Sequence, residues 1–432
     1  MDPESVKAFL AIAAIIFIGF FGNLIFTRFR IPDVLLLIAL GMIIGPDILG
    51  GAFHLVTLGT LDRIDDFQDF FLTAALVLIL FDGGLNLNIK SVMQSMKLAT
   101  FTTLLTLFLE IVLVALALHF FMDVDFLLAL VVGSIIGGTG EAVVIPIVNK
   151  MRIREETKSM LVMESVISDV LVIVIAITLM SVIALGDFNA IDVGTELAVK
   201  FIIGGIIGFA AGIAWLFVLQ RLQNQPLSYM ITVAALFLVA GFVEIDPINS
   251  SSAVAALMFG LAVGNRRFVK RWLTSVTLKL STDEHIHEFH SEISFFVRTF
   301  FYVYLGLLFR FQTFEVIHLV LGVGIIAIIV IVRRGTSLLA ASIGNLGKSD
   351  ADAMFAMMPR GLAAAVLATM PATLLLNKVD TFKESYVQLI LNIVLIVILG
   401  TTILATILSF VTERRIDIRE RKALRERLSQ EP

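Results

Sequence analysis

The sequence predicts an all-α polytopic membrane protein, and three observations lead to that prediction. Hydrophobic residues make up 58% of the 432 residues, and charged residues only 16%. The mean hydropathy is +0.98, which lies far outside the range of a soluble domain of this length. Apolar runs follow one another along the chain, and no long hydrophilic domain separates them.

Each expected helix is an apolar run on the scale of the hydrocarbon core, which a helix crosses with roughly 17–25 residues. The N-terminus lacks the basic segment of a signal peptide, so we expect the first run to remain as a membrane helix. Counting on this scale gives about thirteen spans. They are 5–26, 32–46, 67–87, 98–121, 125–149, 158–184, 195–220, 227–245, 250–264, 286–309, 314–343, 351–376 and 385–411.

The loops between these spans alternate in charge. One set is basic, as at Lys150 to Lys158 and Arg266 to Lys279, and the other is acidic or nearly neutral, as at Asp47 to Asp66. The positive-inside rule assigns the basic loops to the cytoplasm. We therefore expect a multi-pass protein of the cell membrane, surrounded by lipid. Its N-terminus is expected outside and its C-terminus, including the basic tail 413–432, in the cytoplasm.

Several classes of protein do not fit the composition. The net charge is -4 and no basic surface for nucleic acid is apparent, while the absence of cysteine excludes disulfides and thiolate metal sites. An intramembrane enzyme would need a nucleophile–base pair or a motif such as His-Glu-x-x-His, and neither occurs. We expect a transporter, with no cofactor beyond the ions that it carries.

Two of the expected spans are interrupted by glycine and proline. The breaks lie at Thr139-Gly140-Glu141 in span 125–149 and at Pro359-Arg360-Gly361 in span 351–376. Such breaks free backbone carbonyls, which are tolerated where protein or water satisfies them. They occur in the fifth span of the first six and the fifth of the last six, and paired breaks of this kind indicate a transporter site near the membrane midplane.

Two carboxylates lie within one apolar run, in the phrase Glu164-Ser165-Val166-Ile167-Ser168-Asp169. Each bare charge near the bilayer centre costs about 2.5–3.5 kcal/mol. Ser165 and Asp169 share one helix face, and Glu164 and Ser168 share the neighbouring one. Arg360 is the basic residue deep in span 351–376, so we expect it to pair with Glu164. Asp169 is then left to bind a proton or a cation, which compete for it.

Other charged residues within the spans are harder to assign. Asp82, in Phe81-Asp82-Gly83-Gly84-Leu85, fits a functional acid and an interfacial cap equally well. Glu110 lies in the middle of span 98–121 and has no small polar neighbours. Arg333 and Arg334 are expected to neutralise Glu110 or to stabilise the helix ends at the break.

A cluster of His and Glu runs from Asp283 to Glu292 at the start of span 286–309. His287 and His290 lie within it. A metal site and a pH-sensing cluster both fit these residue types, and a solvated helix start is the interpretation that we favour.

Taken together, these phrases resemble the monovalent cation:proton antiporter superfamily, and most closely its NhaP-like Na+/H+ exchanger branch. The resemblance runs across essentially the whole chain. It implies inverted repeats with two crossed discontinuous helices, a homodimer, and elevator-like movement of a core domain. It also implies a core of helices at 98–184 and 314–411, a dimerisation domain at 5–87 and 227–309, and a linker helix at 195–220, within a transmembrane unit 1–412.

The resemblance also implies roles for residues of the site. Asp169 binds the ion, and Ser165, the carbonyl of Thr139 and Asp82 add oxygens, with Gly140 at the break. The family usually has Asn before the key Asp, where this chain has Ser168, and usually Thr-Asp-Pro where this chain has Thr139-Gly140-Glu141. The acid of the family pattern directly follows the threonine, whereas Glu141 stands one residue further along the chain.

The expected function is exchange of a monovalent cation for a proton, electroneutral and one for one. Sodium is the expected cation, with Li+ a second substrate. The alternative is a K+/H+ antiporter or K+ efflux system on the same scaffold. It stays open because both departures from the family pattern, at Ser168 and Glu141, lie at the site expected to set the cation selectivity.

Overall fold

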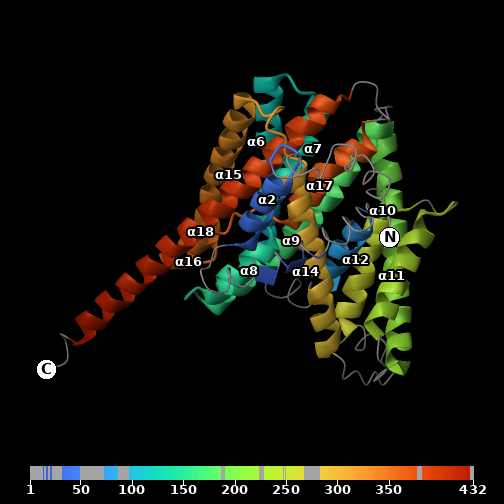
Figure 1. Ribbon diagram of the computed structural model, residues 1–432. Helices are drawn as coiled ribbons and strands as arrows, with labels where there is room; N and C mark the ends of the chain where they lie inside the picture. The colour runs from blue at the N-terminus through green and yellow to red at the C-terminus, as the bar shows by residue number, and fades with distance from the viewer. Residues whose placement is uncertain are drawn as a thin grey trace.

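The computed structural model describes most of the chain, and the account below concerns that part. The first expected span, 5–26, lies almost wholly outside the described residues. Within them the secondary structure is helical and contains no strand (Figure 1), which confirms the predicted all-α class. The described residues are 13, 16–17, 20–21, 32–48, 73–85, 97–185, 190–222, 228–246, 248, 250–266, 283–376 and 382–428.

The observed helices follow the expected apolar runs to within a few residues, except that the two interrupted spans are each divided in two and the last helix is longer than expected. They are α2 (Asp33–Ile44), an unlabelled helix at Thr73–Leu85, α6 (Lys97–Met122), α7 (Phe126–Ile136), α8 (Glu141–Lys150), α9 (Glu155–Leu185), α10 (Ala190–Arg221), α11 (Ser228–Glu244), α12 (Ser252–Gly264), α14 (Asp283–Leu307), α15 (Val316–Ile343), α16 (Lys348–Ala356), α17 (Leu362–Leu374) and α18 (Glu384–Leu428).

Five of the described helices are long and apolar enough to cross a membrane by length and composition. They are Thr100–Met122, Glu155–Ala184, Val199–Arg221, Val316–Ile343 and Glu384–Ile418. The other apolar helices are shorter, at 10–17 residues. Several of the helices also expose large apolar side chains, among them Ile202, Leu238 and Val320, as is expected of surfaces that face lipid. The count of thirteen spans stays a prediction.

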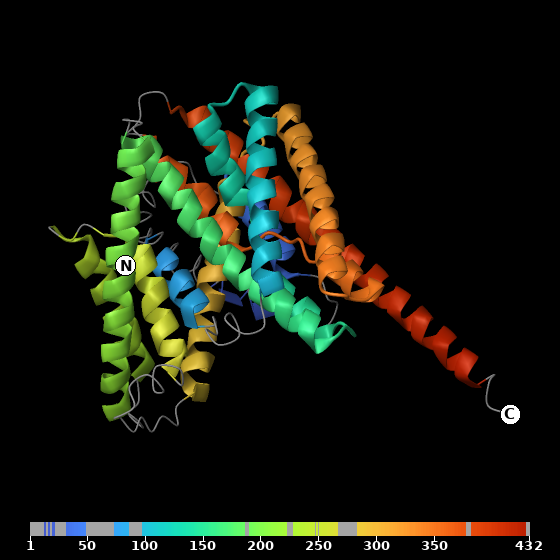
Figure 2. The same ribbon diagram turned by 180° about the vertical axis from the view of Figure 1, so that it is seen from behind.

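The helices pack in two groups. In one group α10, α11 and α12 contact one another, and in the other α6 to α9 and α15 to α18 form a larger bundle. These groups lie on opposite sides of the molecule in Figures 1 and 2. The pair α2 and α14 lies between them, since α14 contacts both α11 and α17.

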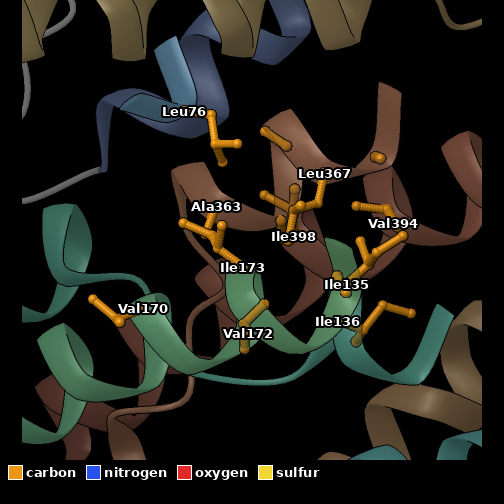
Figure 3. Close-up of a cluster of buried hydrophobic side chains, with 14 of the residues drawn as sticks. Leu76, Ile135, Ile136, Val170, Val172, Ile173, Ala363, Leu367, Val394 and Ile398 are labelled. Atoms are coloured by element: carbon orange, nitrogen blue, oxygen red, sulfur yellow. The ribbon is translucent and has the colours of Figure 1, made fainter. Parts of the chain in front are cut away.

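Buried aliphatic side chains fill the larger bundle around the two breaks. Figure 3 shows side chains from α7, α9, α17, α18 and the helix Thr73–Leu85 meeting there, including Ile135, Ile173, Leu367 and Val394. All four are at most 1% exposed. The broken helices are therefore held by apolar packing on several sides, although their backbones are irregular.

The last helix continues well past its expected end. We expected a span at 385–411 followed by a tail, whereas α18 runs without interruption to Leu428 and projects from the bundle in Figure 1. Its Asp417 accepts a hydrogen bond from Arg152 at 3.0 Å, and Arg415 lies 3.7 Å from Asp352 of α16. These exposed pairs tie the projecting part to the bundle, each with a small energy.

Glycine lets α10 and α12 approach closely. A Cβ on Gly208 would lie 2.2 Å from the carbonyl oxygen of Ala255, and one on Gly212 would lie 2.8 Å from that of Phe259. Small residues at helix contacts allow this backbone approach in membranes. Gly241 of α11, by contrast, has no atom within 4 Å of an added Cβ.

We predict that Gly208→Ala destabilises the protein and that Gly241→Ala does not. Alanine stabilises a helix relative to glycine by about 1 kcal/mol. Gly241→Ala makes this exchange without a steric clash, so it is the control for Gly208→Ala. The measurement is the thermal unfolding midpoint in detergent. Equal midpoints for the two variants would contradict the close packing of α10 on α12.

Candidate functional site

The two helix breaks touch each other through their backbones. The break between α7 and α8 spans 137–140, and the break between α16 and α17 spans 357–361. The amide of Gly140 donates a hydrogen bond to the carbonyl of Pro359 at 2.8 Å. A Cβ on Gly140 would lie 2.2 Å from Cα of Gly361. Only glycine at both positions permits this contact.

The first break is also fixed to α9. Gly138 has φ +77°, a conformation that glycine adopts without steric cost. The amide of Thr139 donates to Oγ of Ser168 at 3.0 Å, and that hydroxyl donates to the carbonyl of Ser165 at 3.0 Å. Ser168 is thus the contact through which α9 holds the loop, and it leaves the neighbouring Asp169 beside the start of α8.

Asp169 receives a backbone contact at this point. The amide of Glu141, the first residue of α8, donates to Oδ2 of Asp169 at 3.4 Å. The hydroxyl of Ser165, one turn earlier on α9, donates to the carbonyl of Val162 at 2.8 Å. The structure therefore joins Asp169 to the start of α8 and Thr139 to α9 through Ser168, whereas the Ser165 hydroxyl bonds within α9.

Glu164 is paired with an arginine that we did not expect. Arg333 of α15 donates from Nη1 and Nη2 to the two carboxylate oxygens of Glu164, the second bond at 3.0 Å. Its Nε donates to the carbonyl of Met354 at 2.9 Å, in the last turn of α16. Both side chains are buried, at 3% and 4% exposure. The guanidinium therefore joins α9, α15 and α16 at one point.

Arg360 pairs with Glu110 of α6. Its Nη2 lies 2.9 Å from Oε1 of Glu110, and its amide donates to Oγ1 of Thr401 on α18 at 3.2 Å. The predicted ion pair between Glu164 and Arg360 is wrong. The physical reason is that α6, which carries Glu110, lies against both α9 and α15. Two acids and two arginines therefore meet there, and each acid takes the nearer guanidinium.

Arg333 takes one of the two roles expected of it, and it also pairs with Glu164. We expected Arg333 and Arg334 to neutralise Glu110 or to stabilise helix ends at the break. Arg333 does the second, through the Met354 carbonyl. Arg334 lies against α16 instead, 3.3 Å from Asp352 and over the ring of Phe355.

Two further acids lie near Asp169. Glu141 is close enough to Asp82 and to Asp169 for electrostatic interaction with both. Within the described residues, no three His, Asp or Glu side chains converge closely enough to hold a metal ion between them. Asp82 is thus linked electrostatically to Glu141, and Glu141 to Asp169.

Arg298 and Tyr302 of α14 face the same region and were missed in the sequence. Both interact electrostatically with Glu141. The signal that could have found them is an arginine and a tyrosine four residues apart in an otherwise apolar run, which places them on one helix face. His287 and His290 lie earlier in α14, and their side chains are outside the described residues.

These features define a class of protein: a helical membrane bundle with two broken helices in contact beside buried carboxylates. The model of the family "sodium/hydrogen exchanger, transmembrane" matches residues 12–412. The chain belongs to this family, whose members are membrane antiporters. The prediction of a transporter and not an enzyme is confirmed by this membership.

Some proteins of similar sequence are named K+/H+ antiporters, and another is named a Na+/H+ antiporter. The K+/H+ antiporter NhaP of Alkalimonas amylolytica is 27% identical over 266 residues, which cover 60% of this chain and 44% of that protein. The K+/H+ antiporter NhaP2 of Shewanella sp. strain ANA-3 is 25% identical over a region that covers 62% of this chain and 45% of that protein. The chain thus spans less than half the length of these relatives. The probable Na+/H+ antiporter 2 of Methanocaldococcus jannaschii is 24% identical over 94% of both chains.

The fold is similar to that of a solved antiporter. The structure of the sodium proton antiporter MjNhaP1 from Methanocaldococcus jannaschii at pH 8 superimposes on this one with a TM-score of 0.75, and the two sequences are 18% identical. The superposition covers 94% of this chain and 99% of that one. An electron-microscopy structure of the same protein gives a TM-score of 0.69. The resemblance to NhaP-like exchangers is confirmed.

We predict that Arg333→Gln destabilises the protein by about 3–5 kcal/mol, because it leaves the Glu164 carboxylate buried without its partner. Adding Glu164→Gln should recover part of that loss, which equilibrium unfolding in mixed micelles measures. The matched control is Arg360→Gln with and without Glu164→Gln, where we expect additive effects. Stronger coupling of Glu164 to Arg360 than to Arg333 would contradict the observed pairing.

We also predict that Gly140→Ala abolishes transport, because its Cβ cannot fit against Gly361. Gly335→Ala on α15 is the control, since an added Cβ there has no atom within 4 Å. The readout is ion-driven proton flux in proteoliposomes containing equal amounts of folded protein. Full activity of Gly140→Ala would mean that the two breaks need not touch.

Proposed function

We propose that this protein exchanges a monovalent cation for a proton across the membrane, with Asp169 as the group that carries either one. The observation that supports this proposal is that the buried acids of the bundle differ in whether an arginine pairs with them. Glu164 and Glu110 each pair with an arginine. Asp169 has no ion pair within the described residues and receives one backbone amide.

An unpaired carboxylate makes exchange obligatory. A bare charge near the bilayer centre is costly, so Asp169 has to be neutralised before it moves between the two sides. Either a proton or a cation does this, and each excludes the other. The protein can then change sides when loaded with one or the other, which couples their opposite flows.

The cation would be held by oxygen atoms, which suit a hard monovalent ion. Asp169 and Ser165 on α9 and the carbonyl of Thr139 at the break supply the inner ones. Asp82 and Glu141 add negative charge from the helix Thr73–Leu85 and from α8. Ser168 and Gly140 keep the break in place, Ser168 through the Thr139 amide and Gly140 through Pro359.

The architecture that goes with this function is the one expected from the family resemblance. It has about thirteen spans, inverted repeats, and two discontinuous helices that cross. A core at 98–184 and 314–411 moves as an elevator against a dimerisation domain at 5–87 and 227–309, with 195–220 as linker. The protein is a homodimer of the cell membrane, with its N-terminus outside and its C-terminus in the cytoplasm.

Sodium is the proposed cation, with Li+ as a second substrate, in an electroneutral one-for-one exchange. The relative and the solved structure that match almost the whole chain are both named for sodium. The alternative is K+/H+ exchange or K+ efflux, which the names of the shorter matches favour. Membrane potential does not drive an electroneutral cycle, because no net charge moves.

The test is proton flux in proteoliposomes loaded with a pH dye. We expect Na+ and Li+ to drive flux that is insensitive to an imposed potential, and Asp169→Asn to abolish it. Flux with K+ alone would select the alternative cation. Absence of flux with every cation would refute the antiporter proposal. Flux that persists in Asp169→Asn would show that Asp169 does not carry the cation or the proton.

A further inference from the structure

We propose that Gly83 of the helix Thr73–Leu85 is a positioning residue that sets the size of the cation accepted beside Asp169. Because Gly83 has no side chain, this helix lies directly against α9 at Val170, the residue after Asp169. The inference rests on the proposed function and deepens it, since it names a determinant of cation selectivity that is not itself a ligand.

The contact between Gly83 and Val170 leaves no room for a side chain. A Cβ added to Gly83 would lie 2.9 Å from Cγ2 of Val170, which is closer than two such atoms pack. Both residues are buried. Valine is stiff at χ1 because its Cβ is branched, so its methyl group cannot readily turn away. A side chain at position 83 would therefore push the helix and α9 apart.

The other side of the same helix is fixed to α12. A Cβ on Gly84 would lie 2.2 Å from the carbonyl oxygen of Leu257. Gly260 of α12 makes the reciprocal approach, because its added Cβ would lie 2.3 Å from the carbonyl oxygen of Phe81. These are contacts between backbones, whereas Gly83 meets the end of a side chain. The helix Thr73–Leu85 is thus seated on α12, and Gly83 forms its contact with α9.

Asp169 lies between two contacts that α9 makes. A Cβ on Gly138 of the first break would lie 2.9 Å from Cγ2 of Val172 and 3.2 Å from Cβ of Ser168. Successive helix residues are turned by about 100°, so Ser168 and Val172 share one face of α9 and Val170 lies on the opposite face. Asp169 is placed between these faces, with the break on one side and the helix Thr73–Leu85 on the other.

An acid directly precedes each of the two residues in contact, and these acids are Asp82 and Asp169. Both are partly exposed, although Gly83 and Val170 are buried. Both also interact electrostatically with Glu141 at the start of α8, as acids on one side of the contact do. The spacing of the two helices at Gly83 therefore sets how far the oxygens of Asp82 lie from those of Asp169.

This spacing bears on selectivity because cavity size and the number of oxygen ligands decide which cation is held best. A smaller cation needs its oxygens closer together. With glycine at position 83, the two helices approach as closely as a backbone and a valine side chain allow, which favours a small ion. An added methyl group widens the gap, and the penalty is greatest for the smallest cation.

The test compares the KM values for Li+ and Na+ in the proteoliposome assay, for Gly83→Ala, Val170→Ala and their combination. We expect Gly83→Ala to raise the ratio of the KM for Li+ to that for Na+ by roughly fivefold, because Li+ is the smaller ion. If the unmodified protein transports K+ and not Na+, the comparison is between K+ and Rb+. Val170→Ala removes the methyl group that clashes, so the double variant should have the same ratio as Val170→Ala alone.

Gly84→Ala is the matched control. Its Cβ meets the backbone of α12, so Val170→Ala should not restore the transport that this variant loses. An unchanged ratio in Gly83→Ala, or a changed ratio that persists in the double variant, would overturn the inference.

A second variant covers the case in which Gly83→Ala does not fold. Val170→Ile enlarges the same contact from the side of α9 and should also raise the ratio, and an unchanged ratio would overturn the inference. Absence of flux with every cation in the unmodified protein would refute the proposed function instead.

Discussion

The hydrogen bond from the Gly140 amide to the Pro359 carbonyl brings together two helix breaks that are far apart in the sequence. The glycines at 140 and 361 leave no room for side chains between them, so each break is held by the backbone of the other. This contact determines where α8 begins, and the first amide of α8 reaches Asp169. The hydrogen bond that Asp169 accepts therefore depends on a backbone contact between two other segments of the chain.

Buried charge is distributed around that contact in an orderly way. Arg333 donates from all three of its side-chain nitrogens to Glu164 and the end of α16, and Arg360 lies against Glu110. Removing one member of such a pair costs more than the pair contributes, since the remaining charge is buried alone. The pairs therefore hold α6, α9, α15 and the second break in one arrangement. Within each pair the charges offset each other, whereas Asp169 forms no ion pair in the described part of the chain and interacts with Arg360 only at longer range.

The breaks were predictable from the sequence because glycine and proline clusters interrupt the helical hydrogen bonds of an apolar run that is otherwise long enough to span the membrane. The charge pairs were only partly predictable. The sequence placed Glu164, Glu110, Arg333 and Arg360 inside apolar runs and predicted a partner for Glu164, but the choice of partner depends on which faces of α6, α9 and α15 meet. Helical periodicity does not contain that information. Arg298 was missed for a related reason, because its pairing with Asp33 appears only when α14 is packed on α2. The continuation of α18 was missed because charged residues end an apolar pattern without ending a helix.

The number of unmatched acids has a direct bearing on stoichiometry. A site with one such acid binds one cation or one proton, and its cycle moves no net charge. Glu141 adds a second acid near Asp169, and without a counter-charge it would attract either a second proton or more of the cation's charge.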